Sequence, residues 1–129
     1  MFKKICLAGI LGLLIINPAQ AADHQRELKF APGADKGVVE NSVVRGDRDV
    51  ISFYAEKGQY CGITLTSLQN NTSLAVLDKD GKLLGGNVDT CADGGAYWWC
   101  ILPYSGCYKI ALSPTFGNTS YKAEVTIFR

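Results

Sequence analysis

The sequence contains few of the residues on which hydrolytic catalysis and metal binding usually depend. It has one histidine, His24, near the predicted mature N-terminus, so no internal histidine is available as the base of a nucleophilic triad. No serine lies in the strand-turn-helix pattern of a nucleophile elbow. The cysteines form no CxxC pair, the spacing that favours zinc. We therefore predict a protein that is not an enzyme and holds no metal or cofactor.

Carboxylate groups at catalytic or calcium-binding spacing are also scarce. Asp47 and Asp49 are conceivable as a glycosidase-like pair, but both flank a turn, and we expect them to point into solvent on the same side. Asp78-Lys79-Asp80-Gly81 resembles the start of a calcium loop, yet the later ligands and the closing glutamate of an EF-hand are missing. We interpret both segments as turns.

Only one long apolar run occurs, and it lies at the N-terminus. Lys3-Lys4 precedes the run Ile5–Ile16, which is shorter than the roughly 20 residues that span a bilayer. Pro18-Ala19-Gln20-Ala21 follows, with small residues at the positions that a signal peptidase reads. We predict that residues 1–21 are a signal peptide cleaved after Ala21. The mature protein should then be periplasmic, with no membrane segment.

The predicted mature chain, residues 22–129, has a length that suits a single domain with a modest core. The whole sequence carries 13 Lys and Arg against 12 Asp and Glu, and loss of Lys3 and Lys4 turns the formal net charge from +1 to −1. Proteins that bind nucleic acid carry clustered positive charge. The charge balance therefore argues against a nucleic-acid partner. The oligomeric state is not predicted.

Four cysteines remain after removal of the signal peptide: Cys61, Cys91, Cys100 and Cys107. An even number in a small exported domain is typical of disulfides, and we predict two. Alternation puts Cys61 and Cys100 on core-facing positions, which favours that pair together with Cys91–Cys107. Proximity in the sequence favours Cys91 with Cys100 instead. A disulfide requires Cα atoms within about 7 Å, so the connectivity stays undetermined at this point.

Short alternating apolar runs separated by turn residues dominate the mature chain. The period of two is that of half-buried strands, and no segment shows a 3.6-residue apolar stripe over helical length. The expected strands lie near residues 28–30, 38–44, 50–56, 60–67, 74–77, 97–102, 107–112 and 121–128. About eight such strands predict an all-β protein, an antiparallel β-sandwich or jelly roll. The runs 50–56 and 60–67, joined by Lys57-Gly58, predict a hairpin.

Leu102-Pro103-Tyr104-Ser105-Gly106-Cys107-Tyr108 predicts a tight turn between two strands. Pro103 fixes its own φ, and Gly106 tolerates the positive φ that sharp reversals often need. We expect Tyr104 and Ser105 at an exposed tip, where binding groups concentrate because strands hold them without covering them. The preceding residues Tyr97, Trp98 and Trp99 are a possible aromatic platform.

The chain resembles bacterial periplasmic inhibitors of invertebrate-type and goose-type lysozymes, a family whose β-sandwich is similar to bacterial pre-peptidase C-terminal domains. The segments that carry the resemblance are Leu28-Lys29-Phe30-Ala31-Pro32-Gly33-Ala34, Gly46-Asp47, Ile51–Gln59, the Ser105-Gly106-Cys107-Tyr108 turn and Tyr121–Val125. The resemblance implies that Ser105 and Tyr108 enter a lysozyme cleft and contact its catalytic carboxyl groups, with Tyr104 and Gly106 beside them. Hydroxyl donors suit carboxylate acceptors.

The function implied by the resemblance is inhibition of a lysozyme or a related peptidoglycan hydrolase in the periplasm. Family members carry a longer, arginine-bearing loop before the last strand, whereas Ser113–Ser120 is short and has no basic residue. Two other functions remain as alternatives. The first alternative is a carbohydrate-binding module that stacks sugars on exposed aromatic residues. The second is an immunity protein against a toxin that degrades the cell wall.

Overall fold

A computed structural model describes residues 22–28, 30, 35–91 and 93–128. The predicted signal peptide and part of the 28–34 segment lie outside these described residues. Within them the chain forms nine strands and no helix. None of the described segments is a helix of the length and hydropathy that crossing a membrane requires.

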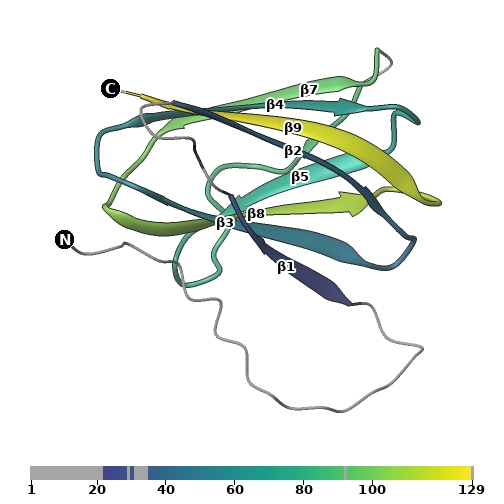
Figure 1. Cartoon of the computed structure of the whole chain (residues 1–129), viewed down its shortest axis with the longest axis horizontal. Helices are drawn as coiled ribbons and strands as arrows, with labels where there is room; N and C mark the ends of the chain where they lie inside the picture. Colours follow the sequence, from purple (N-terminus) through teal and green to yellow (C-terminus); the bar gives the residue numbers. More distant parts are fainter. Residues whose placement is uncertain (1–21, 29, 31–34, 92, 129) are drawn as a thin grey trace.

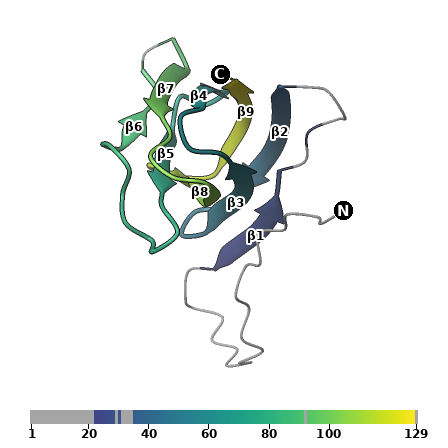
Figure 2. The ribbon, with the colours of Figure 1, turned by 90° about the vertical axis from the view of Figure 1, so that its left-hand side faces the viewer.

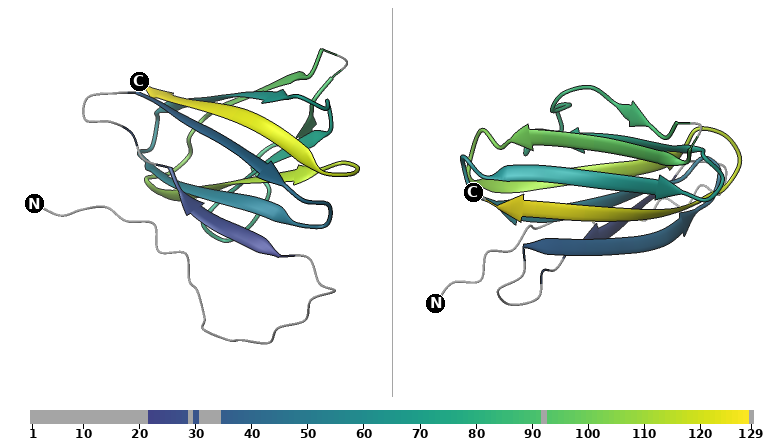
Figure 3. Two further views of the ribbon diagram at one scale, coloured as in Figure 1. Left: turned by 45° about the vertical axis from the view of Figure 1, so that its right-hand side comes forward. Right: turned by 90° about the horizontal axis from the view of Figure 1, so that it is seen from above.

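The strands form two sheets. Their bounds are β1 (Asp23–Glu27), β2 (Lys36–Val43), β3 (Arg48–Ala55), β4 (Tyr60–Ser67), β5 (Thr72–Leu77), β6 (Val88–Asp89), β7 (Gly95–Ile101), β8 (Gly106–Pro114) and β9 (Thr119–Phe128). One sheet has the order β1-β3-β8-β5-β6 and the other β2-β9-β4-β7. All paired neighbours are antiparallel except β1 and β3. The sheets pack face to face (Figures 1 and 3), so the predicted β-sandwich is confirmed.

The core lies between the sheets and is built from alternate residues of the strands. On β4, Cys61, Ile63 and Leu65 are fully buried, and β9 buries every second residue from Thr119 to Ile127. The period-two pattern therefore predicted the inward faces of these two strands correctly. Side chains of alternating direction are what let each sheet present an apolar face to the other.

The predicted hairpin of residues 50–56 and 60–67 is wrong, because β3 and β4 belong to different sheets. Residues 56–59 instead arch from one sheet to the other, and residues 102–105 make a second arch from β7 to β8 at the same end (Figure 2). Backbone hydrogen bonds join the arches: Gly58 N donates to Leu102 O at 2.9 Å, and Leu102 N to Gln59 O at 2.8 Å. Alternation fixes which face is buried but not which strand is the neighbour.

The expectation that Asp47 and Asp49 share one solvent-facing side is also wrong. Asp49 is 1% exposed; it accepts a hydrogen bond from the Tyr121 hydroxyl and lies 3.6 Å from the Arg26 guanidinium. Asp47 lies in the turn before β3, where it accepts hydrogen bonds from Ala22 N at 3.1 Å and from the His24 ring at 3.0 Å. Asp49 thus points toward Tyr121 of the opposite sheet, and β1, which pairs with β3, brings the Arg26 guanidinium near it.

The structure does not contain the two predicted disulfides, because Cys61, Cys91 and Cys100 carry free thiols. Thr90 N bonds to Thr72 O, and Thr72 pairs with Pro114, so Cys91 lies near the end of β8. Cys107 is seven residues earlier on that strand, roughly 23 Å away. The distance far exceeds disulfide reach.

Candidate functional site

The turn between β7 and β8 lies at the end of the sandwich where both arches cross (Figure 2). Ser105 is exposed there, and Tyr104 is half-buried. Gly106 allows the chain to fold tightly against the Tyr104 ring, because a Cβ at this position would meet the Tyr104 Cε2 atom at 3.2 Å. The expected exposure of Ser105 thus agrees with the geometry, whereas Tyr104, also expected at an exposed tip, is half-buried.

A column of three aromatic rings supports this turn from the core. Phe53 of β3 stacks on Tyr108 of β8, with centroids 5.6 Å apart, and Tyr108 stacks on Tyr104, with centroids 4.5 Å apart. Phe53 and Tyr108 are fully buried. The Lys79 ammonium lies 5.3 Å from the Tyr104 ring centroid and covers the outer end of the column. The turn is therefore held by stacking as well as by its backbone.

The hydroxyl groups of the two tyrosines are bound within the protein. The Tyr108 hydroxyl donates to Tyr104 O at 2.6 Å and accepts from Tyr104 N at 3.1 Å. The Tyr104 hydroxyl donates to Cys107 O at 3.2 Å and accepts from Lys79 N at 2.6 Å. Burial raises the pKa of both phenols, and nearby Asp78 and Asp80 also raise that of Tyr104, so both groups stay neutral. These bonds fix the shape of the turn.

Within the described part of the chain, the Ser105 hydroxyl makes one hydrogen bond, as an acceptor. Its Oγ accepts a hydrogen bond from Lys57 N at 2.9 Å, which ties the two arches together again. A hydroxyl that accepts one bond still has its proton to donate. Ser105 is therefore held in place with a donor available at the surface. Sequence reasoning missed Lys57 and Lys79, which are both exposed. Lys57 lies in the arch of residues 56–59 and its backbone bonds to Ser105, whereas Lys79 lies in the loop after β5 and covers the Tyr104 ring.

The aromatic segment before the turn is divided between core and surface. Trp98 is 7% exposed and packs in the core, whereas Tyr97 and Trp99 are 51% and 58% exposed on the outer face. Rings from β4 and β9 join them, since Tyr60 stacks on Trp99, lies tilted against Phe128 and hydrogen-bonds to the Tyr97 hydroxyl. We call Tyr60, Tyr97, Trp99 and Phe128 the outer aromatic surface.

Gly62 lets two of these rings lie close to the sheet. A Cβ there would meet the Tyr97 hydroxyl oxygen at 2.7 Å and the Tyr60 Cε1 atom at 3.0 Å. Sequence reasoning found Tyr97 and Trp99 but missed Tyr60 and Phe128. The pairing of β4 with both β7 and β9 brings these two rings to the surface.

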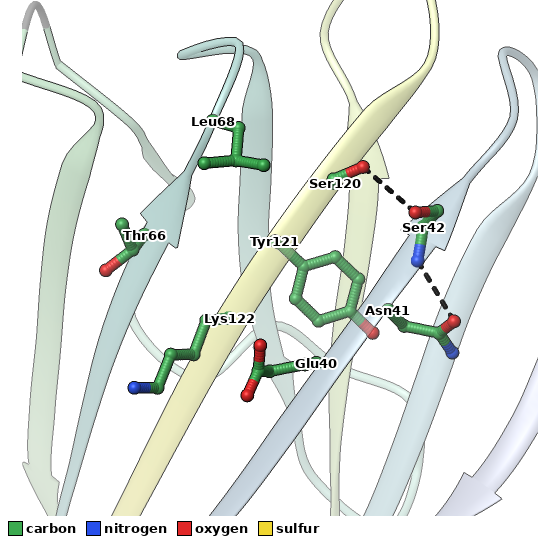
Figure 4. A pocket seen from close by; sticks show the side chains of 8 residues that line it. All are labelled: Glu40, Asn41, Ser42, Thr66, Leu68, Ser120, Tyr121 and Lys122. Carbon is green, nitrogen blue, oxygen red and sulfur yellow. Dashed lines mark hydrogen bonds between the residues drawn. The ribbon is translucent and has the colours of Figure 1, made fainter.

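A groove of about 440 Å³ lies on the same sheet, toward the opposite end of the sandwich (Figure 4). It is lined by Glu40, Asn41, Ser42, Thr66, Leu68, Ser120, Tyr121 and Lys122. Its contacts are internal, such as the hydrogen bond between the Ser42 and Ser120 hydroxyls at 2.9 Å (Figure 4). None of the predicted site residues lines it.

Comparison with protein families by sequence finds no match, and comparison with curated proteins finds none either. Solved structures do match. The crystal structure of Aeromonas hydrophila PliG, a periplasmic lysozyme inhibitor of g-type lysozyme, matches with a TM-score of 0.71 at 20% sequence identity, over 83% of this chain and 98% of that one. The chain has the fold of the PliG proteins.

Two further structures widen this comparison. A mutant of PliG-Ec, the periplasmic g-type lysozyme inhibitor from Escherichia coli, matches with a TM-score of 0.57 at 18% identity, over 84% of this chain and 99% of that one. The pre-peptidase C-terminal domain of a Bacillus anthracis collagenase has the same TM-score at 14% identity, over 86% of this chain and all of that one. The expected relation between inhibitors and pre-peptidase C-terminal domains is thus confirmed at the level of fold.

Proposed function

We propose that this protein is a periplasmic inhibitor of a lysozyme, with g-type lysozymes as the first candidate target. The observation that carries the proposal is the match to a g-type lysozyme inhibitor over almost the whole of that inhibitor's length. The exposed Ser105 turn adds to it, because a supported tip with a free hydroxyl proton suits a cleft lined with catalytic carboxyl groups.

In the proposed complex the turn enters the cleft, and the Ser105 hydroxyl donates a hydrogen bond to a catalytic carboxylate. Tyr104 and Tyr108 act as positioning residues, since their hydroxyls are already bound to backbone atoms of the turn or its neighbours. Lys79, whose ammonium lies over the Tyr104 ring, supplies a positive charge toward the acidic cleft, although Asp78 and Asp80 are also near that ring. A blocked carboxylate can neither transfer a proton nor stabilise charge in glycoside hydrolysis.

The test is a lysis assay with purified mature protein against g-type, invertebrate-type and chicken-type lysozymes. We expect inhibition of the g-type enzyme and a stoichiometric complex in isothermal titration calorimetry. Ser105→Ala should weaken binding by about tenfold, because a buried hydrogen bond to a charged group is lost. The thermal midpoint should move by only a few degrees, as for a single exposed hydrogen bond.

The matched control is Ser113→Ala, which changes the same residue type at the far end of β8. It should leave inhibition unchanged. Equal effects of the two substitutions would contradict insertion of the turn, and no inhibition of any lysozyme class would overturn the proposed function itself.

Export with cleavage after Ala21 belongs to this proposal. Ala22 would be the first residue of the mature protein, and its carbonyl accepts a hydrogen bond from Arg48 N at 2.9 Å, next to the start of β1. The mature N-terminus would therefore be bound to the start of β3. Intact mass spectrometry of protein recovered from the periplasm should give a chain starting at Ala22, and retention of residues 1–21 would contradict this part.

A second candidate function is binding of polysaccharide through the outer aromatic surface. The supporting observation is that Tyr97 and Trp99 are about half exposed and lie beside Tyr60 with a glycine beneath. Aromatic faces of this kind suit the apolar faces of sugar rings. Co-sedimentation with insoluble peptidoglycan tests it: Trp99→Ala should abolish binding if the candidate is correct, whereas Ser105→Ala should not affect it.

A further inference from the structure

Cys61 and Cys100 face each other across two neighbouring strands. They are directly opposite in the register of β4 and β7, and Cys61 is fully buried while Cys100 packs partly buried against the same core. The Cys100 thiol donates a hydrogen bond to Ile101 O at 3.1 Å. Both thiols therefore lie on the inner side of one antiparallel pair.

The backbone hydrogen bonds define the type of this pair. Leu102 N bonds to Gln59 O and Ser67 N bonds to Gly94 O, so odd-numbered β4 positions are the hydrogen-bonded ones. Cys61 and Cys100 form such a pair, in which Cα atoms lie about 5.5 Å apart. A disulfide accepts Cα separations of about 4.4–6.8 Å. The backbone spacing thus permits a bridge.

The side-chain spacing is less favourable and predicts strain. Opposite Cβ atoms in antiparallel pairs lie about 4.5–5.5 Å apart, and the longer value belongs to hydrogen-bonded pairs. A disulfide brings them to about 3.8 Å. β7 must therefore shift toward β4, and it is able to do so because it is the edge strand of its sheet.

We propose that Cys61 and Cys100 form a cross-strand disulfide when the exported chain meets a protein or small-molecule disulfide as oxidant. The Cys100 thiolate attacks the oxidant and forms a mixed disulfide, releasing one thiol. The Cys61 thiolate then attacks the Cys100 sulfur and releases the second thiol. The two cysteines lose two protons and two electrons in total, and the oxidant's disulfide becomes two thiols. Cys91, which lies beyond the other end of β7, takes no part.

Burial determines when this reaction is possible. It raises the pKa of Cys61 to about 12 and also raises that of Cys100, so little thiolate exists at neutral pH in the folded protein. Oxidation is therefore slow after folding and faster while the chain is still open. Strain makes the finished bond easier to reduce than an ordinary structural disulfide.

The bridge would fix the strand that leads into the turn. Leu102 follows Cys100 by two residues, and β7 also carries Tyr97 and Trp99 of the outer aromatic surface. One bond would then hold the edge strand to β4 at the end where the arches cross. This inference rests on the export that belongs to the proposed function but not on lysozyme inhibition, and the refolding test below uses purified protein, so its outcome is independent of both.

The test uses the mature chain unfolded, reduced and refolded with a mixture of reduced and oxidised glutathione. After alkylation, chymotrypsin digestion separates the cysteines, since cleavage after Trp99 and Tyr104 divides Cys91, Cys100 and Cys107. Mass spectrometry should find a peptide that joins Cys61 to Cys100. Adding reductant should lower the thermal midpoint by about 5–15 °C.

Two variants make the result decisive. Cys100→Ala, at a partly buried position, should remove both the joined peptide and the effect of reductant, whereas Cys91→Ala should keep both. Alkylated Cys61 and Cys100 in the oxidatively refolded protein would overturn the proposal. A joined peptide that links either of them to Cys91 or Cys107 would overturn it as well.

Discussion

The two ends of the sandwich are closed in different ways. At the turn end, three stacked rings lead from the core to the surface and finish at Ser105, whose hydroxyl still has a proton to donate. At the other end, buried polar side chains bind one another and the loop before β9: the Thr72 and Thr119 hydroxyls lie 2.6 Å apart, and Asn71 Nδ2 donates to Phe116 O and Asn118 O. Polar groups that bind one another stabilise the fold, whereas a hydroxyl that still has a proton to donate is available for binding a partner.

The substitution expected to have the largest effect on stability is Asn71→Ala, which disrupts the polar network at the end opposite the turn. This side chain is 2% exposed; its amide nitrogen donates bonds of 2.7 and 2.9 Å to Phe116 O and Asn118 O, and its Oδ1 accepts a third from Ser67 Oγ, so the substitution removes three hydrogen bonds. We expect a loss of about 3 kcal/mol in unfolding free energy, or a thermal midpoint lower by roughly 12 °C or more. Calorimetry measures this, and lysozyme inhibition by the folded variant at low temperature should be unchanged.

Asn41→Ala is the control for that substitution. Its side chain accepts a hydrogen bond from the adjacent Ser42 N at 3.0 Å, so the loss of unfolding free energy should be below about 1 kcal/mol. If Asn71→Ala weakened inhibition in folded protein while its stability was kept, the division between a structural end and a binding end would be wrong.

Tyr108→Phe tests whether the turn end depends on its hydrogen bonds or on ring stacking alone. The ring remains, but Tyr104 N and Tyr104 O lose their partner, and we expect a loss of about 1–2 kcal/mol in stability. Hydrogen exchange at the Tyr104 amide should become faster, and inhibition should weaken because the turn is held less firmly. Unchanged exchange and inhibition would show that stacking is sufficient.

Acid should destabilise β1 before it destabilises either end of the sandwich. We expect this to be the smallest of the effects on stability. All side chains of β1 are exposed; Arg48 lowers the pKa of Asp23, and His24 and Ala22 N lower that of Asp47. A lowered pKa gives stability above about pH 4 that is lost as the pH falls through the shifted value. Protection factors for β1 amides should therefore fall as the pH is lowered from about 4 through the shifted pKa values. Those of β4 and β8 should not, and uniform loss would contradict this order.

The sequence predicted the strands and their faces well, because burial alternates with the period of the backbone. The span expected for β4 agrees with the structure, and Cys61, Ile63 and Leu65 point inward as expected. Neighbouring strands could not be predicted in this way. A glycine turn such as Lys57-Gly58 serves a hairpin and an arch between sheets equally, since both need only a reversal of direction.

The candidate site was predicted in part for a related reason. Ser105 lies at the tip as expected from Pro103 and Gly106, which are local signals. The bond from Lys57 N to Ser105 Oγ joins positions 48 residues apart, and no local pattern reveals it. Trp98 and Trp99 are adjacent and aromatic, yet they point to opposite faces, so composition alone made them look alike.

The position of β1 at the edge of its sheet also affects whether copies of the protein aggregate. An edge strand with free backbone groups is a template for another chain, and proteins avoid such addition with short, charged edges. β1 has five residues, Asp-His-Gln-Arg-Glu, and lies at the outer edge of the five-stranded sheet. Copies that meet along this edge oppose like charges on one another. The polar N-terminal strand thus protects the sheet against edge-to-edge aggregation at high concentration.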